Sequence, residues 1–575
     1  MNNTPYLDQL NSIKDLKKLM IPELNELASE LRSQIIAEKP TFLGSSLGVV
    51  ELSIALLYVF NDHRDKILWD IGHQKAPYNL LLKHTKITDQ DPVASAKPAC
   101  VLSRAVGHAL CRDMNYKNYD IISVVGDMSL SSGQAFEAMN HAGSIAGKML
   151  VILNDNVESA QNYGGAFGYY LKQLHSKHFQ DQPCLFEDLG FNYIGPVDGH
   201  NIEELIRIFT KIKDSKEKTP FFLHMKTKKG RGHAPAEADA TSSNSVLNFE
   251  YANNNAQNKK AYKKPPFFAC KALIEAAHLD SKIVVVSLSM SNYSSPFLAF
   301  KDLFPERYID AGVSEGHAIS LACTLATQGF KPYVILYSNM LQRVLDQALI
   351  DACIQSYPVR FIIDHSSILF HSSQHAGFFD STFLGSLSNL VLMSPGSQED
   401  VEAMITFSAK ELTSPCVLRL SKELFLTLDN QKPVELGVGN IIKKGGKVAL
   451  LSYGSVLKDC IEASELLDAN GISTTIADAR FLQPLDERML LNLSNEHDLL
   501  VSVEENASGG LSSHVLRTLN NFGLLSDKLK YHPIYIKELG EMKNNQNVIT
   551  PEKIFNTILN LLSIEDDSNT FYSVI

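Results

Sequence analysis

The pattern of hydrophobic and polar positions predicts a parallel α/β protein. Short runs rich in β-branched residues alternate along the chain with longer segments of helical periodicity. In the first third, residues 121–125 and 149–153 have the pattern of buried strands, and residues 133–142 between them have that of a helix. Strand–helix–strand order of this kind is typical of parallel sheets covered by helices.

The alternation resumes twice further along, which predicts three α/β domains in series. A polar, Asn- and Lys-rich stretch separates the first unit from a second that begins near Pro265, and a third unit follows Asn430. The predicted division is 1–241, a linker over 242–264, 265–428 and 429–575. The later units have predicted strands at 283–287, 308–310, 334–337, 359–363, 390–393, 448–452, 473–477 and 499–504.

Composition and charge exclude some classes of protein. A net charge of -11 and a pI of about 5.9 argue against a general nucleic-acid binder, which needs a basic face. Two basic clusters, 226–231 and 259–264, are open to two interpretations, as solvated loops or as contacts to an anion. With 45% hydrophobic and 20% charged residues, the chain has the composition of a soluble globular protein.

The cysteines and the apolar segments predict a cytoplasmic protein. The eight cysteines are scattered without any Cys-x-x-Cys pair, so reduced thiols are expected. The N-terminus lacks an apolar signal core. The longest apolar stretch, 49–60, contains Glu51 and Ser53 and is too short to span a bilayer. No membrane association is therefore expected.

Polar residues follow two of the predicted strands of the first unit. Gly126 and Asp127 come directly after the strand at 121–125, and Asn154, Asp155 and Asn156 follow the next strand. Open parallel sheets bind ligands at the carboxyl ends of their strands. Asp and Asn there supply the hard oxygen ligands that Mg²⁺ shares with phosphate groups. Each motif alone also fits an ordinary turn at a strand end.

A carboxylate in the second unit suggests more specific chemistry. Glu315 lies on a turn that follows the strand-like segment 308–310. Alone it fits a helix cap, but together with Asp127 and Asn156 it matches the needs of a thiamine-diphosphate enzyme. Such enzymes use a Glu that hydrogen-bonds the cofactor's pyrimidine ring and so helps to activate the cofactor.

Segments in order along the chain resemble the 1-deoxy-D-xylulose-5-phosphate synthase family, which is related to transketolase. The resemblance extends from about residue 40 to residue 560. It is carried by 44–52 (GSSLGVVEL), 69–74 (WDIGHQ), 135–143 (AFEAMNHAG), 190–200 (GFNYIGPVDGH), 228–232 (KKGRG), 341–343 (LQR), 480–486 (RFLQPLD) and 503–506 (VEEN).

The resemblance implies a transketolase-like fold, a homodimer, bound thiamine diphosphate and Mg²⁺, and a reaction between a 2-oxo acid and an aldehyde. The family joins pyruvate to glyceraldehyde 3-phosphate with loss of CO₂. By position, Asp127, Asn156 and Glu158 match Mg²⁺ ligands. The remaining matched positions are His73, Gly126 and Tyr337 for the cofactor, Glu315 and His375 for catalysis, and Arg343 and Lys422 for substrate.

The departures from the family pattern fall at positions linked to chemistry. A family His is replaced by Phe42, and a cofactor-lining His and several hydroxyls are replaced in the segment 96–101. The glycine after the motif aspartate is Met128, which would crowd a phosphate unless its φ stays negative. The other changed positions are Lys97, Asn244, Met340, His365 and Lys422.

Three hypotheses follow. The chain is an active synthase with an altered site, or a thiamine-dependent carboligase that uses another 2-oxo acid and acceptor. The third hypothesis is a catalytically inactive paralogue that acts as a binding partner. Loss of one acid–base group typically costs roughly two to four orders of magnitude in rate, so the several changes favour impaired or redirected activity.

Overall fold

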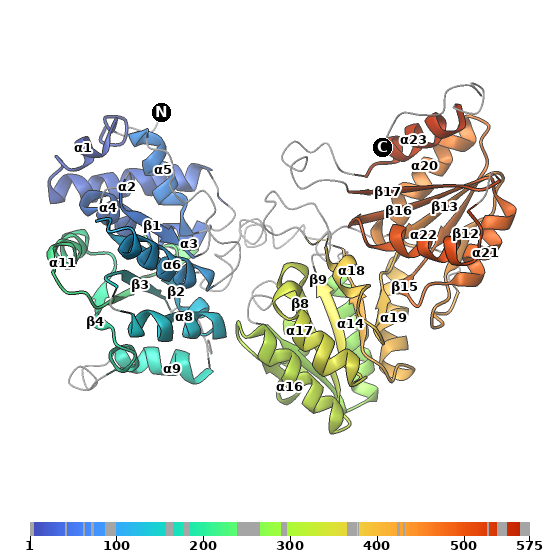
Figure 1. Cartoon of the computed structure of the whole chain (residues 1–575), viewed down its shortest axis with the longest axis horizontal. Coiled ribbons are helices and arrows are strands. Elements are labelled where there is room, and N and C mark those ends of the chain that lie inside the picture. The colour runs from blue at the N-terminus through green and yellow to red at the C-terminus, as the bar shows by residue number, and fades with distance from the viewer. Residues whose placement is uncertain are drawn as a thin grey trace. The chain divides into compact units, whose positions relative to one another are not determined.

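The computed structural model contains three mostly parallel β-sheets, flanked by helices, in two compact units. The first unit comprises Met1–Asn258 with Gly312–Ser314, and the second Lys259–Ala311 with Glu315–Ile575. Each is described by itself below (Figure 1). The structure describes residues 5–38, 40, 43–60, 64–70, 74–86, 99–145, 147–156, 165–175, 184–238, 265–288, 296–364, 377, 379–421, 426–428, 432–525, 528–536 and 549–563.

The first unit contains a five-stranded, fully parallel sheet. Its strand order is β1-β2-β3-β5-β4, with adjacent strands paired in parallel. The strands are β1 (Lys66–Trp69), β2 (Ile121–Gly126), β3 (Leu150–Asp155), β4 (Asn192–Asp198) and β5 (Phe221–Lys226).

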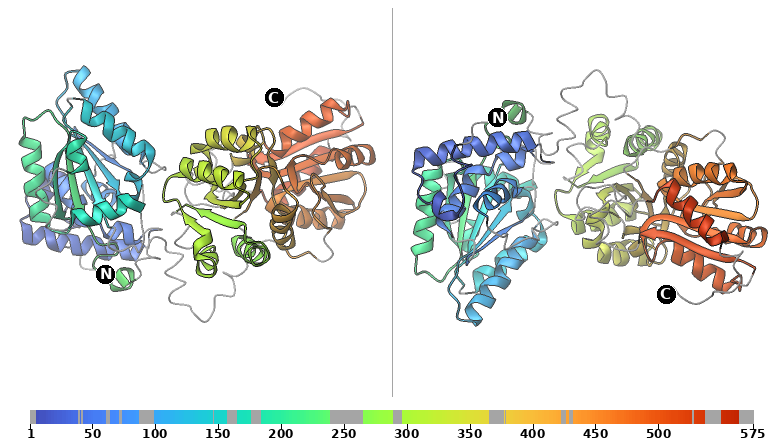
Figure 2. Two further views of the ribbon diagram at one scale, coloured as in Figure 1. Left: turned by 90° about the horizontal axis from the view of Figure 1, so that it is seen from below. Right: turned by 90° about the horizontal axis from the view of Figure 1, so that it is seen from above.

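Both faces of this sheet are buried, because successive side chains of the central strands point into two different cores. Ile122 and Val124 of β2 join one core, whereas Ile121 and Val125 join the other. Helices cover each face, as two further views show (Figure 2). The first core includes α1 (Ile13–Leu16), α2 (Ile21–Glu38), α3 (Leu43–Leu47), α4 (Val50–Val59), α5 (Ala76–Thr85) and α11 (Ile202–Asp214). The second includes α6 (Cys100–Met114), α7 (Asp127–Leu130), α8 (Gly133–Ser144), α9 (Gly165–Leu174) and α10 (Leu185–Asp188).

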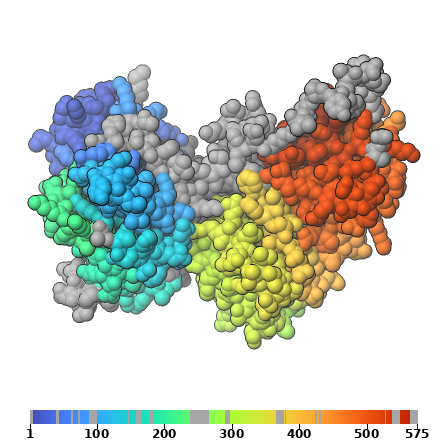
Figure 3. Space-filling view, in the orientation of Figure 1, coloured from blue at the N-terminus to red at the C-terminus, as the bar shows by residue number. Residues whose placement is uncertain are grey.

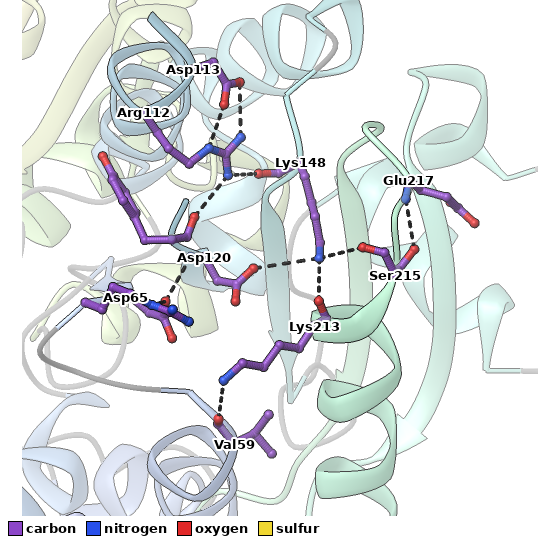
Figure 4. Close-up of polar contacts among 11 residues, drawn as sticks. Val59, Asp65, Arg112, Asp113, Asp120, Lys148, Lys213, Ser215 and Glu217 are labelled. Carbon is purple, nitrogen blue, oxygen red and sulfur yellow. Dashed lines mark hydrogen bonds and ion pairs between the residues drawn. The ribbon is translucent and has the colours of Figure 1, made fainter. Parts of the chain in front are cut away.

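At the amino-terminal edge of this sheet, basic side chains bind backbone carbonyls, most of which end helices. The Lys148 ammonium donates to the carbonyls of Lys213 (2.8 Å) and Ser215 (3.0 Å) at the end of α11 (Figure 4). Lys213 in turn donates to the carbonyl of Val59 (2.7 Å), the last residue of α4. Arg112 donates to the carbonyl of Lys148 (2.7 Å). Cations are favourable at these negative helix ends, so the network fastens two helices to the sheet.

The second unit contains the other two sheets. Its seven-stranded sheet has the order β15-β10-β11-β9-β8-β6-β7, and only β15 runs antiparallel to its neighbour. The strands are β6 (Ile283–Ser287), β7 (Tyr308–Asp310), β8 (Lys331–Tyr337), β9 (Arg360–Asp364), β10 (Val391–Met393), β11 (Cys416–Arg419) and β15 (Phe481–Gln483). Its helices are α14 (Pro265–Leu279), α15 (Leu298–Leu303), α16 (Glu315–Thr327), α17 (Leu345–Gln347), α18 (Asp380–Leu384) and α19 (Gln398–Lys410), with the short helices η6 (Pro305–Arg307), η7 (Ser338–Arg343) and η8 (Ala348–Ile354).

The third sheet has five strands in the order β12-β14-β13-β16-β17, with β12 antiparallel and the others parallel. Because β15 comes from this last part of the chain but pairs with β10, one hydrophobic core spans both sheets of the second unit. The strands are β12 (Asn440–Lys443), β13 (Val448–Tyr453), β14 (Thr474–Asp478), β16 (Leu499–Ala507) and β17 (Lys530–Ile536). The helices are η9 (Gly454–Val456), α20 (Leu457–Ala469), α21 (Glu487–Glu496), α22 (Leu511–Asn521) and α23 (Pro551–Ser563).

The architecture confirms the predicted fold class, an α/β protein with a series of parallel sheets. Every strand predicted from the sequence is present to within a few residues, and the predicted helix at 133–142 is α8. In the part of the chain that the structure describes, no helix combines the length and apolar character needed to cross a membrane. The apolar stretch 49–60 instead forms α4, which is buried on most of its surface. A space-filling view shows the outer surface of each unit in the orientation of Figure 1 (Figure 3).

Candidate functional site

The carboxyl ends of β2 and β3 bring Asp127 and Asn156 together. Gly126 pairs with Asn154 in the parallel register, so the two strands end side by side. The Asp127 carboxylate accepts hydrogen bonds from the backbone N–H groups of Met128 (2.7 Å) and Asn156 (3.0 Å). Two of the three residues that the sequence predicts as metal ligands therefore lie at one edge of one sheet.

The backbone at this edge accommodates Met128 without strain. Met128 lies in α7 and has a helical conformation, and it is not among the described non-glycine residues with positive φ. The steric demand falls instead on Gly126, where an added Cβ would lie 3.2 Å from Nε2 of Gln74. The crowding expected for Met128 depended on a positive φ, which the structure does not show.

Lys229 adds a cation close to Asp127. The lysine follows β5, which lies beside β3, and its ammonium lies near enough to Asp127 for each group to influence the other. Burial raises the pKa of Asp127, and Lys229 opposes that shift. Burial likewise lowers the pKa of Lys229, and Asp127 opposes it. The sequence alone leaves two interpretations of the basic cluster 226–231, which contains Lys229: a solvated loop or a contact to an anion. The place of Lys229 three residues after the end of β5 was the signal that it belongs to this edge.

The loop that carries Lys229 is held by His200, from the turn before α11, and by Glu51 and Arg32 of the helices α4 and α2. Nε2 of His200 accepts a hydrogen bond from the backbone N–H of Lys228 (2.9 Å), and its Nδ1 lies 3.1 Å from the Glu51 carboxylate. Glu51 also binds Arg32, whose Nε donates to the carbonyl of Arg231 (3.0 Å). Although burial works against ionisation, hydrogen bonds from His200 and Arg32 lower the pKa of Glu51. Residues far apart in the sequence thus fix both ends of the Lys229 loop.

The side chains at this edge fit a magnesium-bound diphosphate. A carboxylate and an amide supply the oxygen ligands that Mg²⁺ prefers, and an ammonium group nearby suits the phosphate oxygens. The fit rests on Asp127, Asn156 and Lys229, since the predicted positions His73 and Glu158 lie outside the described residues.

In the second unit, Glu315 lies at the carboxyl edge of the seven-stranded sheet. It begins α16, is only 5% exposed, and its Oε1 lies 3.1 Å from Nη1 of Arg343. Arg343 ends η7, the short helix that follows β8. The structure therefore pairs two of the predicted site residues with each other, one predicted for catalysis and one for substrate phosphate.

Tyr337 lies at the same edge of that sheet. It ends β8 opposite Asp364 of β9, and burial, with a further contribution from Asp364, raises the pKa of its hydroxyl. Met340, which replaces an aromatic residue expected from the resemblance, is 5% exposed and belongs to the hydrophobic core. Met340 therefore contributes to packing in this structure.

Several of the predicted positions fall outside the part of the chain that the structure describes. In the altered segment 96–101, residues 99–101 are described. Ala99 has a left-handed φ of 72° directly before α6, a conformation that L-residues other than Gly rarely adopt. The positions outside are His73, Glu158, His375 and Lys422, together with Phe42, Lys97, Asn244 and His365.

Three family models match the chain in succession. The model described as 1-deoxy-D-xylulose-5-phosphate synthase matches residues 7–90, 82–183 and 175–227. The transketolase pyrimidine binding domain matches 269–426, and the transketolase C-terminal domain matches 437–550. The first match contains Asp127 and Asn156, and the second contains Glu315, Tyr337 and Arg343.

Solved transketolases are similar to the chain at low sequence identity. A split-gene transketolase, described as an inactive β4 tetramer, is 21% identical over 52% of this chain and 98% of that protein, with a TM-score of 0.47. A transketolase from Campylobacter jejuni subsp. jejuni NCTC 11168 is 16% identical over 94% of this chain and 100% of that protein, with a TM-score of 0.43.

The order of the three family models along the chain agrees with the order of the three sheets. The first sheet lies within the synthase match, and the other two lie largely within the transketolase matches. From the family models and the α/β architecture together, the chain belongs to the 1-deoxy-D-xylulose-5-phosphate synthase and transketolase-like family of thiamine-diphosphate-dependent enzymes.

Proposed function

We propose that this protein is a thiamine-diphosphate- and Mg²⁺-dependent transferase that joins pyruvate to glyceraldehyde 3-phosphate with release of CO₂. The observation that carries the proposal is the edge formed by Asp127, Asn156 and Lys229, of which Asp127 and Asn156 lie inside the synthase match. In this proposal Asp127, Asn156 and Glu158 hold Mg²⁺. Gly126 would let the backbone approach the diphosphate, and His73 would lie beside it.

The second unit would complete the chemistry. Thiamine diphosphate, when bound, supplies the electron sink for loss of CO₂ from a 2-oxo acid and for C–C bond formation. Glu315 would orient the pyrimidine and relay a proton to it, with Tyr337 nearby. His375 would serve as an acid–base group, and Arg343 with Lys422 would bind the substrate phosphate. We further propose a homodimer and domains at 1–241, 265–428 and 429–575, joined by the linker 242–264.

The Glu315–Arg343 ion pair favours a second candidate, a carboligase whose acceptor has no phosphate. Arg343 contacts Glu315 at 3.1 Å, and both side chains are largely buried, at 14% and 6% exposed. A phosphorylated acceptor would have to compete with Glu315 for this guanidinium, whereas an acceptor without phosphate would not. Lys422 in place of an arginine points the same way, because lysine cannot bind phosphate through a planar fork.

Two measurements test these candidates. Calorimetric titration with thiamine diphosphate and Mg²⁺ should give micromolar affinity; absence of binding would reject both enzymatic candidates and leave the binding-partner hypothesis. A coupled assay with pyruvate should then compare glyceraldehyde 3-phosphate with unphosphorylated glyceraldehyde, using Glu315→Gln as the inactive control. Faster turnover with the phosphorylated aldehyde supports the synthase, and the reverse order supports the carboligase.

A further inference from the structure

Two histidines and an aspartate gather on one face of the first sheet, outside the residues assigned to the diphosphate. In the β3–β5 register, Leu153 pairs with His224 and Asp155 with Lys226. Since side chains alternate along a strand, Asp155 and His224 point to the same face, the face of the second core. His175 follows directly after α9, whose Leu171 and Leu174 belong to that core.

The ligand atoms of these residues converge. Nε2 of His224 lies 2.6 Å from Oδ2 of Asp155, and Nε2 of His175 lies 2.8 Å from the same oxygen. One metal-ligating atom from each residue lies within 4.8 Å of the others. The side chains of Asp155 and His224 are fully buried, whereas that of His175 is 9% exposed and connects the cluster to solvent.

We propose that Asp155, His175 and His224 form a binding site for a divalent transition-metal ion of the Zn²⁺ class. Two imidazoles and a carboxylate are a ligand set that Zn²⁺ and related ions accept, with a fourth position open to water or another ligand. Ligands at about 2.0–2.2 Å in a tetrahedron lie roughly 3.3 Å from one another. The two contacts to Oδ2 of Asp155, at 2.6 and 2.8 Å, are shorter than that separation, and all three ligand atoms lie within 4.8 Å of one another, so small side-chain rotations suffice.

The surroundings of His224 supply a partner for a metal-bound imidazole. Its Nδ1 lies 2.8 Å from the Tyr193 hydroxyl. When Nε2 binds the ion, the ring proton moves to Nδ1, and the Nδ1–H can donate a hydrogen bond to the Tyr193 oxygen. The imidazole stays neutral, so metal binding at this residue releases no net proton. Such an outer hydrogen bond fixes the orientation of a ligating histidine. In the metal-free protein the Nε2 atoms of His224 and His175 contact Asp155, which keeps the buried cluster satisfied.

The proposed site differs from the expected magnesium site in ligand type and in place. Asp127 and Asn156 offer oxygen ligands only, whereas this cluster offers two nitrogens, which Mg²⁺ binds poorly. Asp155 is the neighbour of Asn156 in the chain, but it faces His224 in the second core. The proposal does not depend on the proposed function, and the two can fail separately.

The test is a Co²⁺ titration of the chelator-stripped full chain in millimolar Mg²⁺, which occupies sites of oxygen ligands. Wild-type protein should bind one Co²⁺ per chain, with a visible absorption band of tetrahedral geometry that Zn²⁺ removes. His175→Gln should abolish the band, whereas the matched change at an exposed helical histidine, His141→Gln, should leave it. Tyr193→Phe should weaken binding by about 10-fold, because it removes the hydroxyl that orients the His224 ring.

Asp127→Asn separates this site from the magnesium site, because it should leave the Co²⁺ band intact. Absence of the band in the wild-type protein would overturn the proposal. So would a band that survives His175→Gln or disappears with Asp127→Asn. Should circular dichroism show His175→Gln to be unfolded, the decision passes to the wild-type stoichiometry and to Tyr193→Phe, whose affinity must fall for the proposal to stand.

Discussion

The two edges of the first sheet use charged side chains in different ways. At the amino-terminal edge, Lys148 and Lys213 donate to carbonyls that end α4 and α11 (Figure 4). At the carboxyl edge, Asp127 accepts two backbone N–H groups, and Lys229 lies close by. Burial raises the pKa of Asp127 and lowers the pKa of Lys229, so it favours the neutral form of each side chain.

This difference indicates that the charges at the amino-terminal edge stabilise the fold, whereas those at the carboxyl edge serve ligand binding. Charges at the amino-terminal edge meet backbone dipoles of the protein itself, so their interaction free energy stabilises the fold. Charges at the carboxyl edge are held in a partly desolvated place, which costs free energy that a bound cation and anion would offset. Variants at the two edges should therefore affect different measurements.

The largest effect is expected at the carboxyl edge. Asp127→Asn should weaken the affinity for thiamine diphosphate with Mg²⁺ by at least about 100-fold, because a charged metal ligand is lost. The melting temperature should change little, because the variant removes a carboxyl that burial disfavours in its charged form. Calorimetry measures the cofactor affinity and a thermal melt the melting temperature, with Asp188→Asn, a change at an exposed aspartate, as the control. Unchanged affinity would remove Asp127 from the proposed site.

The opposite edge should show the opposite result. Lys148→Met loses two charge-assisted hydrogen bonds to carbonyls, at 2.8 and 3.0 Å, and should lower the free energy of unfolding by about 1–3 kcal/mol. Cofactor affinity should stay within error of the wild type. Thermal melts compare the stability of Lys148→Met with that of Lys117→Met, which changes an exposed lysine of the same unit. Loss of cofactor affinity without loss of stability would contradict the separation between the edges.

A smaller effect is expected from the residue that positions the Lys229 loop. His200→Phe keeps the ring shape but removes the acceptor of the Lys228 N–H, and it should weaken cofactor affinity by about 10-fold. In a Lys229→Met background the same change should cost much less, because residues that act through one group are not additive. Equal losses in both backgrounds would show that His200 does not act through Lys229.

A last effect, on the pH dependence of stability alone, concerns a buried carboxyl with no proposed ligand. Burial, with a contribution from Asp400, raises the pKa of Asp478 well above its ordinary value. A raised folded pKa means that the native state retains the proton when the unfolded state has lost it. Stability should thus fall as pH rises from the ordinary aspartate range to the raised value, by at most about 1.4 kcal/mol per pH unit.

Asp478→Asn should remove this part of the pH dependence. Thermal melts between pH 5 and pH 8 should show a flatter profile for the variant than for the wild type, with the gain in stability largest at pH 8. Parallel profiles at all pH values would mean that Asp478 does not titrate in this range.

Local sequence predicted the central strands because their side chains are buried on both faces. Strands β2, β3, β6 and β13 are continuous β-branched or apolar runs, and each lies within a few residues of its predicted position. The strands not predicted include β4, whose residues are mostly half-buried, and β15, which has only three residues. The pairing of β15 with β10 depends on a tertiary contact between distant segments, which no local pattern contains.

The sequence by itself determined the α/β class, the strand-end positions of Asp127, Asn156 and Glu315, and the family resemblance. These follow from short-range periodicity and from motifs in order along the chain. The pairing of Glu315 with Arg343, the approach of Lys229 to Asp127, and the meeting of His175 and His224 on Asp155 were decided only by the tertiary structure. Such contacts join residues from different strands and helices, so sheet order and helix packing, rather than spacing in the chain, bring their atoms together.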